Sequence, residues 1–135
     1  MGVGELPVAL RGLRLRVIVD EGEYEGHPRV PPGTVVNLLG DPHRPDFLVI
    51  ELDSPIEVER PSGTGPVPIR HLAVSHLRGW EWDWDLFFRP PAEFTPLFVK
   101  VWHVFDPRLA KSQEWTTETM VYVARGSLAR ERQRT

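Results

Sequence analysis

The chain has 135 residues, no cysteine and a net charge of −3 from 19 acidic and 16 basic residues. The lack of cysteine excludes disulfides, thiolate zinc sites and cysteine nucleophiles. The length is typical of one domain or two very small ones, and the mild acidity disfavours a protein that coats nucleic-acid phosphates, because that function needs a basic stripe.

The N-terminal region contains no apolar run of signal-peptide length, because Arg11, Arg14 and Arg16 interrupt it. No other segment approaches the ~20 apolar residues that a membrane span requires. We therefore expect a cytoplasmic protein that does not contact a membrane.

The first half of the chain predicts short β-strands separated by polar loops. Alternating or β-branched apolar residues place these strands at 13–20, 34–40, 47–53, within 54–68, and at 69–77. Glycine and proline mark the loops between them. Five short strands within about eighty residues are typical of a small barrel or a sandwich.

The second half is less regular. Residues 80–88 alternate between aromatic and acidic side chains, and the prolines that follow end that pattern. Residues 97–106 are apolar on both faces, which predicts a central strand covered on both sides. One or two helical turns are predicted at 107–115 and a further strand at 117–126. The remaining residues, "SLARERQRT", predict a frayed end or a brief helix.

The segments "VPPGTVVNLLGDPHRPDFLVIELDSPI" and "VPIRHLAVSHL" resemble an SH3-like small barrel over residues 13–77. In such barrels a strand of the "GTVV" kind follows a proline-rich loop, and a turn and a strand like "FLVIELD" come next. The resemblance implies a recognition module for peptides, nucleic acid or proteins, and it implies no reaction. The predicted fold is mostly β, with at most one or two short helices. An SH3-like barrel occupies residues 1–79, and a second set of strands at 80–135 packs on it and shares its core, as two small lobes or one domain.

The stretch "GWEWDWD" is the most unusual in the chain. On a strand its three carboxylates would share one face at about 6.5 Å spacing, too far apart for one hard cation whose ligands lie within about 2.6 Å. Trp80, Trp82 and Trp84 would share the other face. They either pack between the two halves of the chain or stack on bases, sugars or an arginine of a partner.

The histidines and serines do not form a recognisable catalytic or metal-binding pattern. His71 and His76 are five residues apart on one predicted strand and so face opposite ways. A two-histidine metal site from His27 and His43, in proline-rich loops, stays open. Ser75 precedes His76 without a G-x-S-x-G motif, and no P-loop or dinucleotide motif is present. We expect no catalytic residue, no metal and no cofactor.

The distribution of charge favours a binding function. An acidic loop with one aromatic residue contains Glu21, Glu23, Tyr24 and Glu25, whereas the C-terminal tail is rich in arginine. Such a loop suits a basic protein partner, attracted by long-range electrostatics and bound by complementary charge. We predict a non-enzymatic binding module for a protein partner, with the inhibitor- or immunity-type protein of a bacterial toxin as one concrete form. The predicted contacts are Glu21, Glu23, Tyr24, Glu25, Trp80, Trp82 and Trp84.

Two alternatives to the protein-binding module stay open. The first is a nucleic-acid-binding or ribosome-associated SH3-like module that uses Arg14, Arg16 and the basic tail, with tryptophan rings for stacking. The second is a small enzyme whose histidine and carboxylate residues are scattered along the chain.

Overall fold

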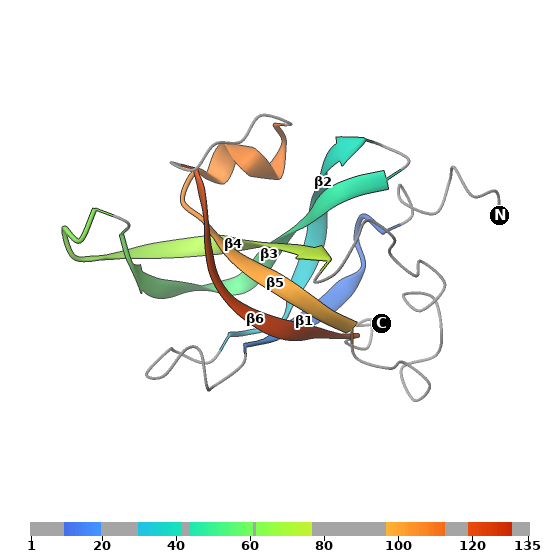
Figure 1. Cartoon of the computed structure of the whole chain (residues 1–135), viewed down its shortest axis with the longest axis horizontal. Coiled ribbons are helices and arrows are strands. Elements are labelled where there is room, and N and C mark those ends of the chain that lie inside the picture. Colours follow the sequence, from blue (N-terminus) through green and yellow to red (C-terminus); the bar gives the residue numbers. More distant parts are fainter. Residues whose placement is uncertain are drawn as a thin grey trace, which may run out of the picture.

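Six antiparallel strands form one sheet that closes into a ring (Figure 1). The computed structural model describes residues 10–19, 30–41, 44–60, 62–76, 97–112 and 119–130. The strands are β1 (Arg14–Val19), β2 (Gly33–Asp41), β3 (Arg44–Glu59), β4 (Pro66–His76), β5 (Leu97–Val104) and β6 (Met120–Arg130). Each strand pairs with the next along the chain, and β6 pairs with β1. We call this closed sheet the strand ring.

The prediction of a mostly β fold with at most one or two short helices is confirmed. The helical turns predicted near residue 107 occur as one 3-10 helix, η4 (Pro107–Ala110), which is the only helix in the described part of the chain. The strands that follow residue 80 belong to the same sheet as the earlier ones, because β5 pairs with β4 and β6 pairs with β1.

Two stretches differ from their predicted structure. Residues 127–130 were expected in a frayed end or a brief helix, and that prediction is wrong, because they extend β6 and pair with β1 from Leu15↔Arg130 to Ile18↔Ser127. The short strand predicted within 54–68 is the continuation of β3, which runs through an irregularity between Glu51 and Ile56. In both places backbone pairing with a neighbouring strand keeps the chain extended, and the local sequence does not indicate this pairing.

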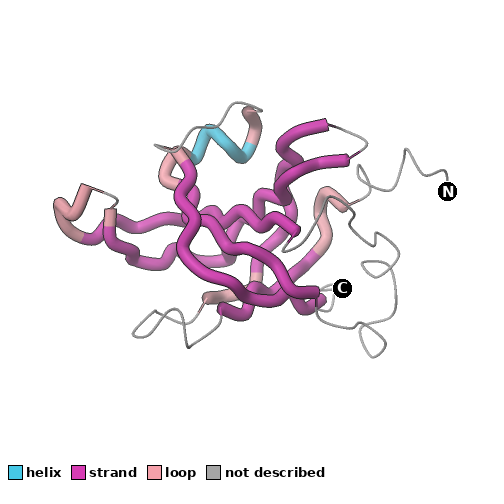
Figure 2. Tube along the Cα trace, viewed as in Figure 1, coloured by secondary structure: helices cyan, strands magenta, loops and turns pink. Residues whose placement is uncertain are grey.

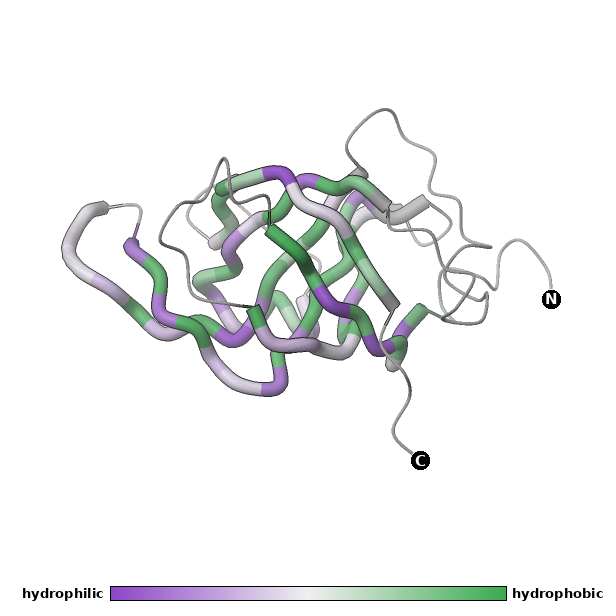
Figure 3. Tube along the Cα trace, turned by 90° about the horizontal axis from the view of Figure 1, so that it is seen from below, coloured by the Kyte–Doolittle hydropathy of each residue, from purple (hydrophilic) through white to green (hydrophobic). Residues whose placement is uncertain are grey.

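The interior of the strand ring is filled by apolar side chains at alternate strand positions. Hydrophobic and hydrophilic residues alternate along the strands in Figure 3, as a closed sheet with one buried face requires. Leu15, Ile50, Leu72 and Leu128 are almost fully buried in this cluster. Burial of each side chain of this size stabilises the folded state by roughly 1.5–3 kcal/mol, so the interior cluster is the main stabilising element.

A second apolar cluster lies on the outside of the ring, where η4 covers it (Figure 2). Leu109 of η4 is buried in this cluster. The buried side chain of Asn37 holds the turn in place, because its Nδ2 donates to the carbonyl oxygens of Leu109 at 2.8 Å and Ser112 at 2.7 Å. Arg11 donates to Asn37 Oδ1 at 3.3 Å. This polar anchor fixes η4 on the sheet.

The hairpin of β3 and β4 extends beyond the rest of the ring (Figure 1). Its outer part pairs from Ile56↔Ile69 to Glu59↔Pro66, while the pairing of β4 with β5 begins only at His71. Pro66 and Pro68 lie on this stretch of β4. Proline is tolerated where a strand is paired on one side only, and it discourages another chain from adding to that edge.

The ring closes at Gly126, which pairs with Val19 of β1 and with Val99 of β5. A Cβ atom at this position would collide with the carbonyl oxygen of Ile18 and would lie 3.2 Å from Cγ2 of Val101. Only glycine therefore allows β1 and β6 to approach as closely as they do.

We expect Gly126→Ala to lower the free energy of unfolding by about 1–3 kcal/mol, because the added methyl group overpacks the seam. Urea denaturation followed by circular dichroism measures the change. Ser127→Ala, one position further along β6, is the control and should stay within about 0.5 kcal/mol of the parent. An unchanged stability of Gly126→Ala would contradict the close approach of β1 and β6.

Asp106 caps η4 and should titrate at a low pH. Its carboxylate accepts hydrogen bonds from the Arg108 side chain and backbone, and these bonds lower the pKa of Asp106 below its ordinary value of 3.8, the side-chain bond most strongly. Because the folded pKa is depressed, the stabilisation is present above the unfolded pKa and is lost as the pH falls through the folded one. Carboxyl NMR titration should give a midpoint below 3.8, and Arg108→Gln should raise it. A midpoint at or above the ordinary value would show that the cap does not form.

Candidate functional site

The residues that the sequence predicts as partner contacts lie outside the described residues. This applies to the acidic loop with Glu21, Glu23, Tyr24 and Glu25, and to Trp80, Trp82 and Trp84. Their role stays a prediction, and the site is sought among the side chains that the structure places.

A row of directly paired residues crosses the outside of the strand ring from β1 to β6. Its members are Arg14, Thr34, Glu51, His71, Val104 and Met120, each opposite the next. Paired residues of neighbouring strands lie on the same face of a sheet. The apolar end belongs to the outer cluster beside η4, which leaves a polar end on β1 to β4.

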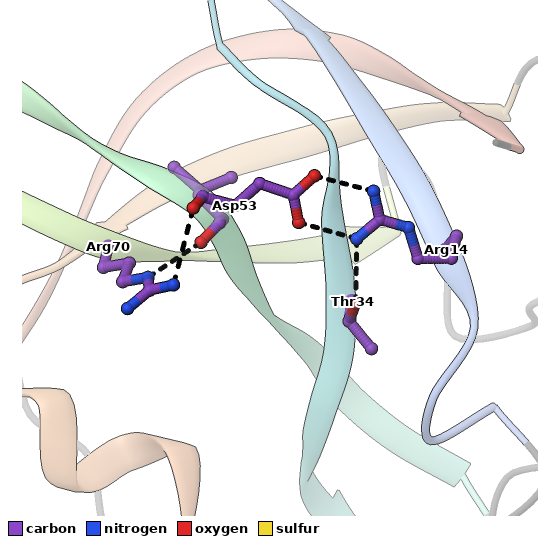
Figure 4. Close-up of polar contacts among 5 residues, drawn as sticks. Arg14, Thr34, Asp53 and Arg70 are labelled. Atoms are coloured by element: carbon purple, nitrogen blue, oxygen red, sulfur yellow. Dashed lines mark hydrogen bonds and ion pairs between the residues drawn. The ribbon is translucent and has the colours of Figure 1, made fainter. Parts of the chain in front are cut away.

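The strongest polar contact at that end joins Arg14 to Asp53 (Figure 4). The Nη1 and Nη2 atoms of Arg14 donate to the two carboxylate oxygens of Asp53 at 2.6 and 2.7 Å, and Nη1 also donates to Thr34 Oγ1 at 3.2 Å. The Arg14 side chain is 16% exposed and that of Asp53 37%. A two-point pair of this kind is stronger and more directional than a single-contact ion pair.

Asp53 lies where the β3–β4 ladder is interrupted. The register of that ladder breaks between Glu51 and Ile56, and the backbone groups in such a break need other partners. Arg70 Nε donates to the Leu52 carbonyl oxygen at 3.0 Å and its Nη2 to that of Asp53 at 3.4 Å (Figure 4). The Asp53 N–H donates to the carbonyl oxygen of Pro32 at 2.9 Å. The cluster of Arg14, Asp53 and Arg70 therefore holds the interrupted ladder in place.

The histidines that the structure describes do not converge. His71 Nε2 lies 3.4 Å from Oε2 of Glu51 on the outside of the ring. His103 pairs with Leu72 of the interior cluster, and its ring contacts that of Phe105 at a centroid distance of 6.1 Å. The described ranges contain no group of three or more histidine or acidic residues that could hold a metal ion.

The outside of β5, β6 and β1 differs in character from the rest of the ring. These three neighbouring strands contain no aspartate or glutamate. Their outward positions form a surface that we call the cationic–aromatic face, and its members are Arg16, Ile18, Phe98, Lys100, Trp102, Tyr122 and Arg125. Phe98 is 71% exposed, Ile18 47% and Tyr122 43%, and these three are the exposed large hydrophobic residues of the described part.

The strand register orders this face into rows. Lys100 is directly opposite Arg125, with Trp102 opposite Tyr122 on one side and Phe98 opposite Ser127 on the other. On β5 successive rows lie about 6.6 Å apart, which is two residues of strand rise. On β6 the register shift near Trp102 places Tyr122 three residues from Arg125. The two cations therefore lie between an aromatic pair and a single exposed ring.

Trp102 is held firmly in this arrangement. Its ring makes edge-to-face contacts with Phe47 and Tyr122 at centroid distances of 5.4 and 5.5 Å. Its Nε1 donates to Ser75 Oγ at 3.1 Å. Because the indole is fixed by three neighbours, it orients the more exposed ring of Tyr122 in turn.

Sequence reasoning missed most of this face because the strand at 97–106 was expected to be covered on both sides. The pairing of β5 with both β4 and β6 agrees with a central strand, but the exposure of Phe98 shows that its outer face is open near its start. Hydrophobicity alone suggested burial. The signal that could have identified the face was Lys100 between two aromatic residues at alternate positions.

Comparison of the chain with protein-family models, with curated proteins and with solved structures finds no match. The described residues include no helix with the length and hydrophobicity of a membrane span.

The Arg14–Asp53 pair should be measurable by a double-mutant cycle. We expect a coupling energy of about 1 kcal/mol between Arg14→Gln and Asp53→Asn, at the upper end of the range for exposed pairs, because the pair is bidentate and Arg14 is mostly buried. Urea unfolding of the two single variants and the double variant gives this value. A cycle on Asp106 and Arg108, which is also bidentate but whose arginine is 86% exposed, is the control. Equal coupling in the two cycles would show that the burial of Arg14 does not strengthen its pair with Asp53.

Proposed function

We propose that the protein is a non-enzymatic binding module and that its ligand is nucleic acid, bound on the cationic–aromatic face. One observation carries the proposal. Three adjacent strands present outward cations and exposed aromatic rings, and the strands themselves contain no carboxylate. Cationic surfaces with aromatic rings are the common means by which proteins bind nucleic-acid chains without a catalytic step.

The acidity of the whole chain does not argue against a local cationic surface. The exposed carboxylates of the ring are concentrated on β3, at Asp46, Asp53, Glu57 and Glu59. In the order of the strands β3 is the furthest from β6. Association with a polyanion depends on the potential at the binding face more than on net charge, so a chain of net charge −3 can still present such a face.

The proposal includes the assignment of the ring to the SH3-like small barrels, on the resemblance of residues 13–77. Its support is the order of β1 to β4, which follow one another around the ring as consecutive antiparallel neighbours. Under this assignment β5 and β6 complete the barrel and supply most of the binding face.

A basic protein partner is the second candidate. Its proposed contacts are Glu21, Glu23, Tyr24 and Glu25, as in an inhibitor- or immunity-type protein. The described part adds one supporting observation, namely that Glu57 and Glu59 are exposed on the extended β3–β4 hairpin. A partner that also contacts Glu57 and Glu59 would lie on the β3 side of the ring, away from the cationic–aromatic face.

Charge reversal on the cationic–aromatic face tests the nucleic-acid proposal. The variant Lys100→Glu with Arg125→Glu should bind fluorescein-labelled RNA or DNA oligonucleotides at least tenfold more weakly than the parent in fluorescence anisotropy. Each lost phosphate contact should also reduce the slope of log affinity against log salt by about 0.7 for single strands. The matched control is Arg60→Glu with Lys111→Glu, which changes net charge equally at exposed positions off the face.

Equal losses in the two charge-reversed variants would show that the face is not the site. If the parent binds no nucleic acid and instead recovers a stoichiometric basic protein from its host, the second candidate replaces the first. In that case charge reversal at Glu21, Glu23 and Glu25 should abolish recovery of the partner.

A further inference from the structure

The cationic–aromatic face has two exposed rings with cations between them. Phe98, Lys100 and Trp102 follow one another at alternate positions on the outside of β5, and Arg125 and Tyr122 of β6 lie opposite the last two. Phe98 is therefore about 13 Å along the strand from the Trp102–Tyr122 pair. This spacing separates two ring surfaces by one row of positive charge.

The ring surfaces available to a ligand are those of Phe98 and Tyr122. Trp102 is only partly exposed, its ring makes T-shaped contacts with Phe47 and Tyr122, and its Nε1 donates to Ser75. Tyr122 is 43% exposed and is oriented by Trp102, whereas Phe98 is 71% exposed. A ring that is oriented before binding loses little conformational freedom when a flat ligand stacks on it.

We propose that the face takes single-stranded rather than duplex nucleic acid, with unpaired bases stacked on Phe98 and Tyr122 and the intervening phosphates at Lys100 and Arg125. This inference rests on the proposed function. In a duplex the faces of the bases are covered by their neighbours, so rings on a sheet surface cannot reach them, whereas splayed bases of a single strand stack on such rings. A duplex could use only the cations.

Charge argues against a second copy of the chain as the occupant. In a symmetric pair formed through this face, Lys100 and Arg125 at its middle would meet the same cations of the other copy. Like charges brought together in an interface oppose association. The same row of cations is complementary to the phosphates of a nucleic-acid strand.

The test compares three polyanions and two pairs of substitutions by fluorescence anisotropy over a series of salt concentrations. The ligands are a labelled single strand, the duplex of the same sequence, and heparin as a competitor without bases. Phe98→Leu with Tyr122→Leu removes both rings and keeps apolar side chains, whereas Phe98→Tyr with Tyr122→Phe keeps both rings. Circular dichroism and thermal unfolding verify that each variant is folded.

The parent should prefer the single strand over the duplex. The double leucine variant should lose about tenfold or more in affinity for the single strand, as expected from the removal of two stacking rings. The salt slope and the inhibition constant of heparin should stay unchanged. The ring-conserving variant should bind within about threefold of the parent, a margin well below the loss of one stacked base.

The stacking inference is overturned if the parent binds duplex and single strand equally, or if the double leucine variant binds the single strand like the parent. If Lys100→Glu with Arg125→Glu still weakens binding in that case, the proposed function survives. If no polyanion binds at all, the proposed function fails with it. Concentration-dependent self-association in sedimentation velocity, abolished in the double leucine variant, would assign the face to a second copy and overturn the inference.

Discussion

The pairing of β6 with β1 is the interaction on which the rest of the structure depends. It joins residues near the two ends of the described chain, from Leu15↔Arg130 to Val19↔Gly126, and converts a row of hairpins into a closed sheet with no free edge along this seam. Without it, the interior side chains of β1 and β6 would lose their cover on one side. Because the paired residues are so distant in sequence, closing the ring costs conformational entropy, and burial of the interior cluster must offset this cost.

Closure also determines which surfaces remain for function. In a closed sheet the inner positions are mostly filled by the core, so a surface for binding is expected outside or at the ends. On β2 to β4 the outside is used by η4, by the outer apolar cluster and by the polar contacts of Asp53. The outside of β5, β6 and β1 has no comparable cover among the described residues near Phe98, which explains why the candidate face lies there.

The sequence predicted the features that depend on local alternation. Leu15 and Val17 of β1 alternate with outward residues and are buried in the interior, as their period of two indicates. The long course of β3 could not be predicted in the same way, because Pro55 and Asp53 suggest a break. What carries the strand past them is contact with Arg14 and Arg70, which lie 39 and 17 residues from Asp53 in sequence.

The candidate face could not be predicted from the sequence for a related reason. Periodicity identifies a strand and its two faces, but it does not say which apolar face is covered, since that depends on neighbouring elements. Val104 and Phe98 both lie on the outside of β5, yet Val104 is buried in the outer cluster and Phe98 is exposed. Among the described elements η4 packs on the cluster that contains Val104, and Asn37 holds η4 there through bonds to carbonyl groups 72 and 75 residues away.

Composition was misleading about charge in the same way. A net charge of −3 suggested a chain unsuited to nucleic acid, but net charge is a sum that ignores where charges lie. In the strand ring, acidic residues are concentrated on β3 and absent from β5, β6 and β1. Single exposed hydrophobic residues are ordinary on protein surfaces. Here Phe98, Tyr122 and Ile18 share a surface with Lys100 and Arg125 on three strands whose own residues include no carboxylate. That coincidence, rather than the exposure of any one ring, is what supports the proposed binding face.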